Sequence, residues 1–294
     1  MPGSPKVRAL LALLVAAFLF GATFVVVKTA LDDVGPLTFV GWRFLIGALL
    51  LGAFAFPKGR LLWLHGLVAG IALFAGYTLQ TAGLALTSAS NSALITGMYV
   101  VFTPLLAAAF SRRPPNPWAV GSAAVAFAGL ILVTGTEGIS FGAGDLLTLG
   151  CALAFALHIL ALARFARHHP VVPFTAVQLA VTAALALAAS NLVEGGGLPP
   201  QSVWPALVVA GVAVGVGAFL LQIWAQTVVG PATAAVVLAA EPAFGVATAW
   251  VVLGERLDPS GWLGSALIVA AIFVAVTRQA DEPALRAEAV TPAH

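Results

Sequence analysis

The chain has 294 residues, of which 61% are hydrophobic and only 8% are charged. Soluble domains are roughly 45–50% apolar and about 25% charged, so this composition excludes a soluble globular protein and indicates an integral membrane protein. The 13 Lys and Arg residues and 11 Asp and Glu residues are too few for a disordered chain or a nucleic-acid-binding surface, and the single cysteine, Cys151, excludes an internal disulfide and a cysteine-based metal cluster.

Long apolar runs separated by short turn segments follow one another along the whole chain. A bilayer core of about 30 Å needs roughly 20 apolar residues in a helix. The runs therefore predict an all-α membrane protein with ten spanning helices, at residues 8–31, 36–56, 61–86, 89–110, 118–134, 144–162, 172–192, 203–228, 232–253 and 261–276. The breaks between them carry Gly, Pro, Asp, Asn and Ser, notably at 32–36, 87–92, 112–117 and 194–200.

The distribution of cations predicts the direction of these spans. With the N-terminus in the cytoplasm, ten of the 13 cations fall on the inner side, as the positive-inside rule requires: Lys6, Arg8, Lys58, Arg60, Arg112, Arg113, Arg164, Arg167, Arg278 and Arg286. Most acidic residues then fall in the outer loops. We expect both termini to be cytoplasmic in a multi-pass protein of the cell inner (plasma) membrane.

The two halves of the chain resemble each other. A tryptophan and two glycines recur in the same order 141 residues later, as Trp63, Gly70 and Gly76 against Trp204, Gly211 and Gly217. This predicts a first five-helix repeat over residues 1–138, a second over 139–278 and a disordered cytoplasmic tail over 279–294. Five helices are an odd number, so the repeats would have inverted topology. Many secondary transporters have this architecture, with a midplane site between the repeats, although duplicated channels and enzymes also exist.

Several motifs resemble those of a known family. These are Phe20-Gly21-Ala22-Thr23-Phe24 with Lys28, Trp42-Arg43-Phe44, the run from Gly76 to Leu84, and Ala240-Glu241-Pro242 followed by Leu253-Gly254-Glu255-Arg256-Leu257. They are similar to the drug/metabolite transporter superfamily in its ten-helix EamA-type branch, and within it to YddG-like exporters of aromatic and other neutral amino acids. The resemblance implies export of small metabolites through a cavity between two inverted repeats. One departure is Ser111-Arg112-Arg113, which stands where a first-half copy of Gly254-Glu255-Arg256 would lie.

Three ionisable residues lie inside the predicted spans, where charge is costly and usually functional. Arg43 has a structural role, in which it pairs with a helix C-terminus or snorkels toward the outer surface, or it has a functional one. In the functional role it holds a substrate carboxylate through its planar fork. Glu241 precedes Pro242, which frees a backbone carbonyl in mid-helix. The Glu241 carboxylate binds an ammonium group or a proton, or it pairs structurally with a neighbouring helix. His158 is a titratable site residue or a hydrogen-bonded core residue.

Neutral polar side chains complete the predicted site. Tyr77, Gln80, Thr81 and Leu84 share one helix face through i, i+3, i+4 and i+7 spacing. A phenol in mid-membrane needs a partner, which makes Tyr77 and Tyr99 candidates. The full set of predicted substrate-binding residues is Tyr77, Gln80, Tyr99, Gln222, Glu241, His158 and Arg43.

We therefore expect a secondary transporter that exports small metabolites, aromatic or neutral amino acids first among them, by alternating access. The alternatives are an exporter of drugs or nucleobase-like metabolites and, in a different class, a membrane-embedded enzyme or a channel. The sequence lacks a Walker pattern, an aspartate-rich motif and a filter motif, so we predict no enzyme activity, no catalytic residues, no cofactor and no metal. The expected partners are a small-molecule substrate and the lipid bilayer, without nucleic acid, and the expected state is a monomer.

Overall fold

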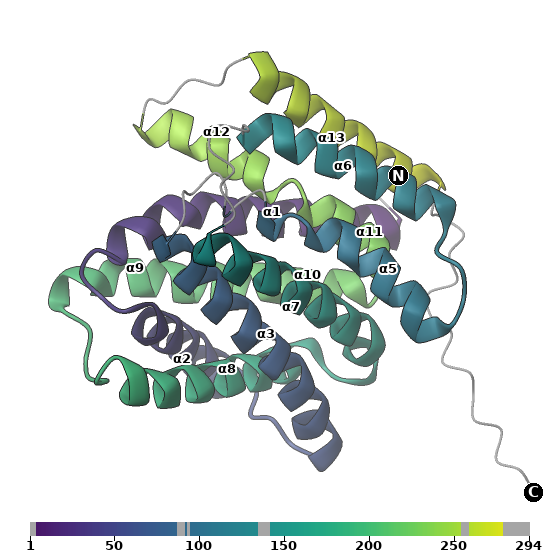
Figure 1. Ribbon diagram of the computed structural model, residues 1–294. Coiled ribbons are helices and arrows are strands. Elements are labelled where there is room, and N and C mark those ends of the chain that lie inside the picture. Colours follow the sequence, from purple (N-terminus) through teal and green to yellow (C-terminus); the bar gives the residue numbers. More distant parts are fainter. Residues whose placement is uncertain (1–3, 87–91, 93–94, 135–141, 254–258, 279–294) are drawn as a thin grey trace, which may run out of the picture.

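The computed structural model describes residues 4–86, 92, 95–134, 142–253 and 259–278, and these form helices and connecting turns without a strand. Figure 1 shows the helices packed side by side, with α6 and α13 along one side and α2 and α8 on the opposite side. The elements are α1 (Pro5–Ala30), α2 (Pro36–Phe54), α3 (Arg60–Leu86), α5 (Tyr99–Ser111), α6 (Pro117–Thr134), α7 (Ala143–Phe165), η1 (Ala166–His168), α8 (Val171–Val193), η2 (Gln201–Val203), α9 (Trp204–Val209), η3 (Ala210–Ala218), α10 (Phe219–Gln226), α11 (Pro231–Leu238), α12 (Glu241–Leu253) and α13 (Pro259–Arg278).

Six helical segments of the described chain are long and apolar enough to cross a membrane. They are Pro5–Thr23, Pro36–Phe54, Arg60–Leu86, Ala143–His168, Val171–Val193 and Gln201–Gln226. Shorter apolar helices lie at the other four predicted spans, at Tyr99–Ser111, Pro117–Gly129, Pro231–Gly245 and Pro259–Val274. Six clear spans are thus present, and the remaining four of the ten predicted spans are represented by helices below that length. The predicted turn at 87–92, the motif at 254–257 and the tail at 279–294 lie wholly or mostly outside the described residues.

The surface of the bundle is strongly apolar. Large hydrophobic side chains on several helices are well exposed, including Leu49 at 65%, Phe54 at 79% and Phe273 at 69%. A water-exposed surface with this many uncovered apolar side chains is unusual, whereas lipid tails solvate it without cost. The exposed residues therefore face the bilayer, and the chain is a multi-pass membrane protein.

Two helices that approach the centre of the bundle are irregular. The segment that ends in α12 is interrupted at Ala239 and Ala240, between α11 and α12. The cause is Pro242, which has no N–H to donate to the carbonyl of Leu238 four residues earlier. The segment from Trp204 to Gln226 instead contains a π-helical stretch, η3, at its middle. Such wider turns are often found at functional sites.

Glycines permit the helices to approach closely around these irregular segments. A β-carbon at Gly21 of α1 would overlap the backbone oxygen of Glu241 at the start of α12. A β-carbon at Gly211 of η3 would lie 2.7 Å from the backbone oxygen of Arg43 in α2. Because helices in lipid associate mainly through close packing, these contacts set the positions of α1, α2, α12 and η3 relative to one another.

Candidate functional site

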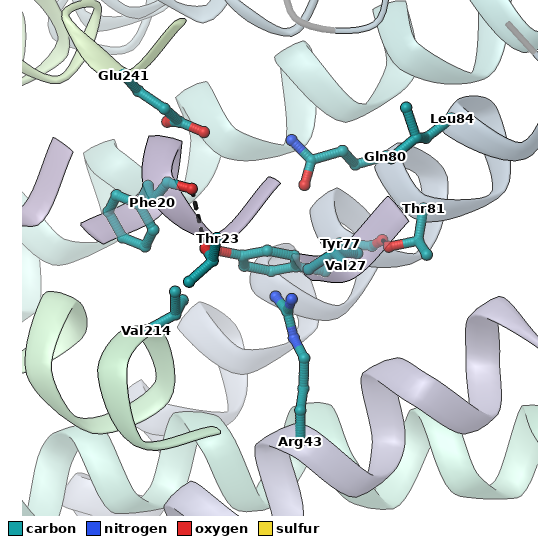
Figure 2. A pocket seen from close by; sticks show the side chains of 10 residues that line it. All are labelled: Phe20, Thr23, Val27, Arg43, Tyr77, Gln80, Thr81, Leu84, Val214 and Glu241. Carbon is teal, nitrogen blue, oxygen red and sulfur yellow. Dashed lines mark hydrogen bonds between the residues drawn. The ribbon is translucent and has the colours of Figure 1, made fainter. Parts of the chain in front are cut away.

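A small cavity lies inside the bundle where α1, α2, α3, η3 and α12 meet. It has about 30 Å³ of free volume. This is enough for two or three water molecules or one small polar group, since a single water needs roughly 10–15 Å³ by this measure. Figure 2 shows the ten residues that line it, which are Phe20, Thr23, Val27, Arg43, Tyr77, Gln80, Thr81, Leu84, Val214 and Glu241.

Arg43 reaches the cavity from α2 and is 3% exposed, so its side chain does not snorkel to the surface. Its Cζ atom lies 4.2 Å from the centre of the Tyr77 ring and 4.6 Å from the centre of the Phe44 ring. Both distances are within the range of a cation–π interaction. Its Nε and Nη2 atoms are buried without a hydrogen-bond partner. The arginine is therefore held by aromatic rings rather than by an acidic residue.

An aromatic cluster supports Arg43 from the side of α3 and α10. The Tyr77 ring packs edge to face against Phe44 at 4.9 Å and Phe155 at 5.1 Å between ring centres. Phe219 lies 6.1 Å from both Phe44 and Tyr77 and 5.3 Å from Phe20. Edge-to-face pairs at these separations are favourable beyond the area they bury. The rings that line the cavity are thus fixed by their neighbours.

Glu241 lies across the cavity from Arg43, and Figure 2 shows its carboxylate pointing toward the same space. It is the first residue of α12, directly after the interruption of the helix. Its position is determined by the backbone of α1, because Gly21 contacts the backbone oxygen of Glu241. The cavity therefore has a guanidinium on one side and a carboxylate on the other.

The remaining polar side chains of the cavity come from α3 and α1. The amide of Gln80 points toward the space between Arg43 and Glu241 in Figure 2. The hydroxyl of Thr81 donates to the Tyr77 carbonyl at 2.7 Å, and that of Thr23 lies 3.0 Å from the carbonyls of Leu19 and Phe20. These threonines satisfy their hydroxyls within their own helices, which leaves their methyl groups and Gln80 to meet a ligand.

Four of the seven predicted site residues line this cavity, namely Arg43, Tyr77, Gln80 and Glu241. The predicted face of α3 faces it as a whole, since Thr81 and Leu84 line it as well. The other three predicted residues, His158, Tyr99 and Gln222, are buried elsewhere in the bundle.

Two of those three have partners within the protein. His158 donates from Nε2 to the side-chain oxygen of Gln178 at 2.8 Å, with its ring edge toward Phe219. Gln222 donates to the side-chain oxygen of Gln226 at 3.2 Å, and Gln226 donates to the Ile159 carbonyl at 2.8 Å. Tyr99 is buried with an unpartnered hydroxyl, but it is not part of the cavity lining. His158 thus has the hydrogen-bonded core position that was the alternative for it.

The cavity residues contributed by α1 and η3 are not among the predicted site residues. Phe20, Thr23 and Val27 follow i, i+3 and i+7 spacing on α1, and this spacing could have identified a common face. Val214 has no such signal, because its direction depends on the π-helical stretch, which changes the angular spacing of side chains.

The chemistry of the cavity lining suits the binding of a small molecule. Among the described residues, no group of three His, Cys, Asp or Glu side chains is arranged to hold a metal ion. The lining combines two opposite charges, an amide and a phenol with apolar walls, a pattern typical of a small-molecule binding site.

Comparisons with known proteins agree with this picture. The sequence model of the EamA-like transporter family matches residues 7–135 and, separately, residues 142–277. An uncharacterized transporter of Archaeoglobus fulgidus is 33% identical over 94% of this chain and 88% of its own length. The uncharacterized transporter YwfM of Bacillus subtilis is 29% identical over 89% of this chain and 91% of its own. A solved crystal structure has the same fold, with a TM-score of 0.77 at 24% identity, and the match covers 93% of this chain and 98% of that one.

Proposed function

The chain belongs to the EamA-like transporter family, and on this basis we propose that it is a secondary transporter that exports small metabolites by alternating access. The substrate class that we propose is amino acids, aromatic and other neutral ones first. The alternative is a drug or a nucleobase-like metabolite. The observation that carries the proposal is the cavity with Arg43 and Glu241 on opposite sides, because an amino acid carries the two complementary charges.

Helix packing supports the two inverted repeats that alternating access needs. The helix α2 packs on α8 and α6 packs on α13, which pairs corresponding helices of the two predicted halves. The contact between α3 and α7 has a counterpart in the contact of α1 with η3 and α10. The separate matches of the family model to residues 7–135 and 142–277 support the same division. A rocking motion of one repeat against the other would open the cavity to each side in turn.

The broken helices also correspond between the halves. The break at Ala239 and Ala240 precedes Glu241, and a break at Gly97 and Met98 precedes Tyr99 in α5. Thr103-Pro104 in the first half corresponds to Glu241-Pro242 in the second, so only the second half has a carboxylate before the proline. Discontinuous helices commonly form the binding sites of secondary transporters. The proposed transporter thus has one acidic group rather than two at its centre.

The orientation that we propose follows from the cations. Lys58, Arg60, Arg112, Arg113 and Arg164 would lie at the cytoplasmic side of the inner membrane. Arg43, Tyr77 and Thr81 then lie nearer the outer side of their helices, so an exported substrate would pass the charged residues late in its path.

A counterflow assay in proteoliposomes tests the function. The purified protein is reconstituted with unlabelled L-phenylalanine inside, and uptake of labelled L-phenylalanine is followed over time and concentration. A carrier gives a saturable, transient accumulation, whereas a channel gives linear flux without accumulation. Competition by amino acids, nucleobases and cationic drugs then separates the substrate classes. The amino-acid proposal is wrong if only nucleobases or cationic drugs compete or are transported.

A further inference from the structure

The guanidinium of Arg43 has one hydrogen-bonding edge that no described residue satisfies. Its Nε and Nη2 atoms are both buried and unpartnered. In a guanidinium these two N–H groups point in the same direction along one edge of the plane, and together they fit the two oxygens of one planar anion. Buried charged donors without a partner are costly to keep. Such an edge is therefore unexpected in a residue whose role is only structural.

The aromatic neighbours of Arg43 leave this edge unsatisfied. The Tyr77 and Phe44 rings, 4.2 and 4.6 Å from its Cζ atom, interact with the charge of the guanidinium through their π systems. Neither Nε nor Nη2 donates a hydrogen bond to the Tyr77 hydroxyl or to another described residue. Figure 2 shows the guanidinium of Arg43 next to the Tyr77 ring at the cavity.

The acidic residues of the described chain have positions that leave this edge free. Glu194 accepts the backbone N–H groups of Leu37 and Thr38, and Asp33 accepts the hydroxyl of Ser202. Asp145 accepts the N–H of Gly142. Glu241 lines the same cavity but is not bonded to Nε or Nη2 of Arg43.

We propose that the Nε and Nη2 edge of Arg43 is an anion subsite that binds one carboxylate group by a two-point hydrogen bond. That this carboxylate belongs to the transported metabolite rests on the proposed function. The cavity has space for two or three water-sized groups, which suits a carboxylate but is less than an aromatic side chain needs. The subsite therefore selects carboxylate-bearing metabolites over cationic drugs and nucleobases, and the rest of the substrate needs space that opens during transport.

Acetate and acetamide test the subsite directly, because they have nearly the same shape and differ in charge. Binding of each to the purified full-length protein is measured by saturation-transfer NMR at constant ionic strength. The wild type should bind acetate about tenfold or more tightly than acetamide, the ratio expected from a charge-assisted pair. Arg43→Gln should abolish this preference. Arg43→Lys keeps the charge without the planar fork and should weaken acetate binding about tenfold.

A matched control and a folding measurement make the result decisive. Arg113→Gln removes an exposed arginine outside the cavity and should leave acetate binding unchanged. Arg43→Gln breaks no ion pair, so its unfolding temperature should stay the same or rise. If Arg43→Gln does not fold, the acetate affinity of Arg43→Lys is used to test the subsite instead. Equal binding of acetate and acetamide by the wild type, or unchanged acetate binding in a folded Arg43 variant, overturns the subsite.

The transport assay separates this proposal from the proposed function. If acetate binds through Arg43 but counterflow fails for every compound, the subsite stands and the transport proposal falls. If counterflow is saturable and L-phenylalaninamide is carried as well as L-phenylalanine, transport stands and the assignment of the substrate carboxylate to this subsite is overturned.

Discussion

At the scale of single residues, the cavity has one carboxylate, on Glu241, which comes from the end of a broken helix. A carboxylate in such a position binds a cationic group of a ligand or carries a proton between the two sides of the membrane. These two roles predict different consequences for one conservative substitution, because glutamine keeps the size of the side chain but has neither its charge nor its titration.

We expect Glu241→Gln to reduce the counterflow rate of L-phenylalanine about tenfold or more, since the charge-assisted contact with the ammonium group is lost. The measurement is initial rate against substrate concentration at several pH values, with Thr248→Val in the same helix as a control outside the cavity lining. A pH dependence that is the same in Glu241→Gln and in wild type would contradict a role as proton carrier. An unchanged apparent affinity would contradict ammonium binding.

At the scale of elements, α2 and α8 are joined by a side-chain cap at one end. The Glu194 carboxylate accepts the N–H of Leu37 at 2.8 Å and the N–H of Thr38 at 2.9 Å, and it accepts the Thr38 hydroxyl at 2.8 Å. The first turn of a helix has unpaired N–H groups and a positive partial charge, which an acidic side chain stabilises. Here the acid comes from a residue more than 150 positions away in the chain.

Glu194→Ala should therefore destabilise the folded protein by about 1–2 kcal/mol, the usual effect of losing a helix cap. Asp32→Asn is the matched control, because Asp32 is an exposed acid in the turn before α2. Thermal unfolding of the two detergent-solubilised variants and the wild type gives the comparison. An equal unfolding temperature for Glu194→Ala and wild type would show that the cap contributes nothing to stability.

The helices also show which features of the fold the sequence could predict and which it could not. The apolar run after Pro36 predicted a helix start at the residue where α2 begins, because proline is favoured in the first helical turn. The break before α12 followed from Pro242. The partner of the α2 terminus, Glu194, was recognised only as a turn residue, since a long-range cap has no local pattern. Helical periodicity likewise identified the face of α3 that lines the cavity. It could not show that the His158 ring hydrogen-bonds Gln178 and does not line the cavity, because that contact joins two helices.

At the scale of the whole molecule, a histidine pair forms a second link between the proposed halves. Its two members lie near cations in the sequence, Lys58 and Arg60 on one side and Arg164 and Arg167 on the other. Nδ1 of His65, near the start of α3, lies 2.8 Å from Nε2 of His169 in the α7–α8 connection. The His65 ring is stacked on Phe165 at 4.1 Å, and the His168 ring is 6.4 Å away. One imidazole donates and the other accepts, so at least one ring must be neutral for this bond to exist.

Acid should weaken this link between the halves. Burial, and next the neighbouring His65 and His168, lower the pKa of His169. The folded state then binds fewer protons than the unfolded state, so the link is fully present above the unfolded pKa of about 6.5 and its contribution falls as pH drops below that value.

We expect the wild type to lose up to about 1 kcal/mol more stability than His169→Asn between pH 8 and pH 5, a modest value because the pair is only partly buried. Thermal unfolding across this range measures the difference, with His168→Asn as the control that keeps the bonded pair. Parallel pH curves for wild type and His169→Asn would exclude the pair as the source, whereas a stability difference that narrows from pH 8 to pH 5 would identify a pH-dependent contact between the two proposed halves.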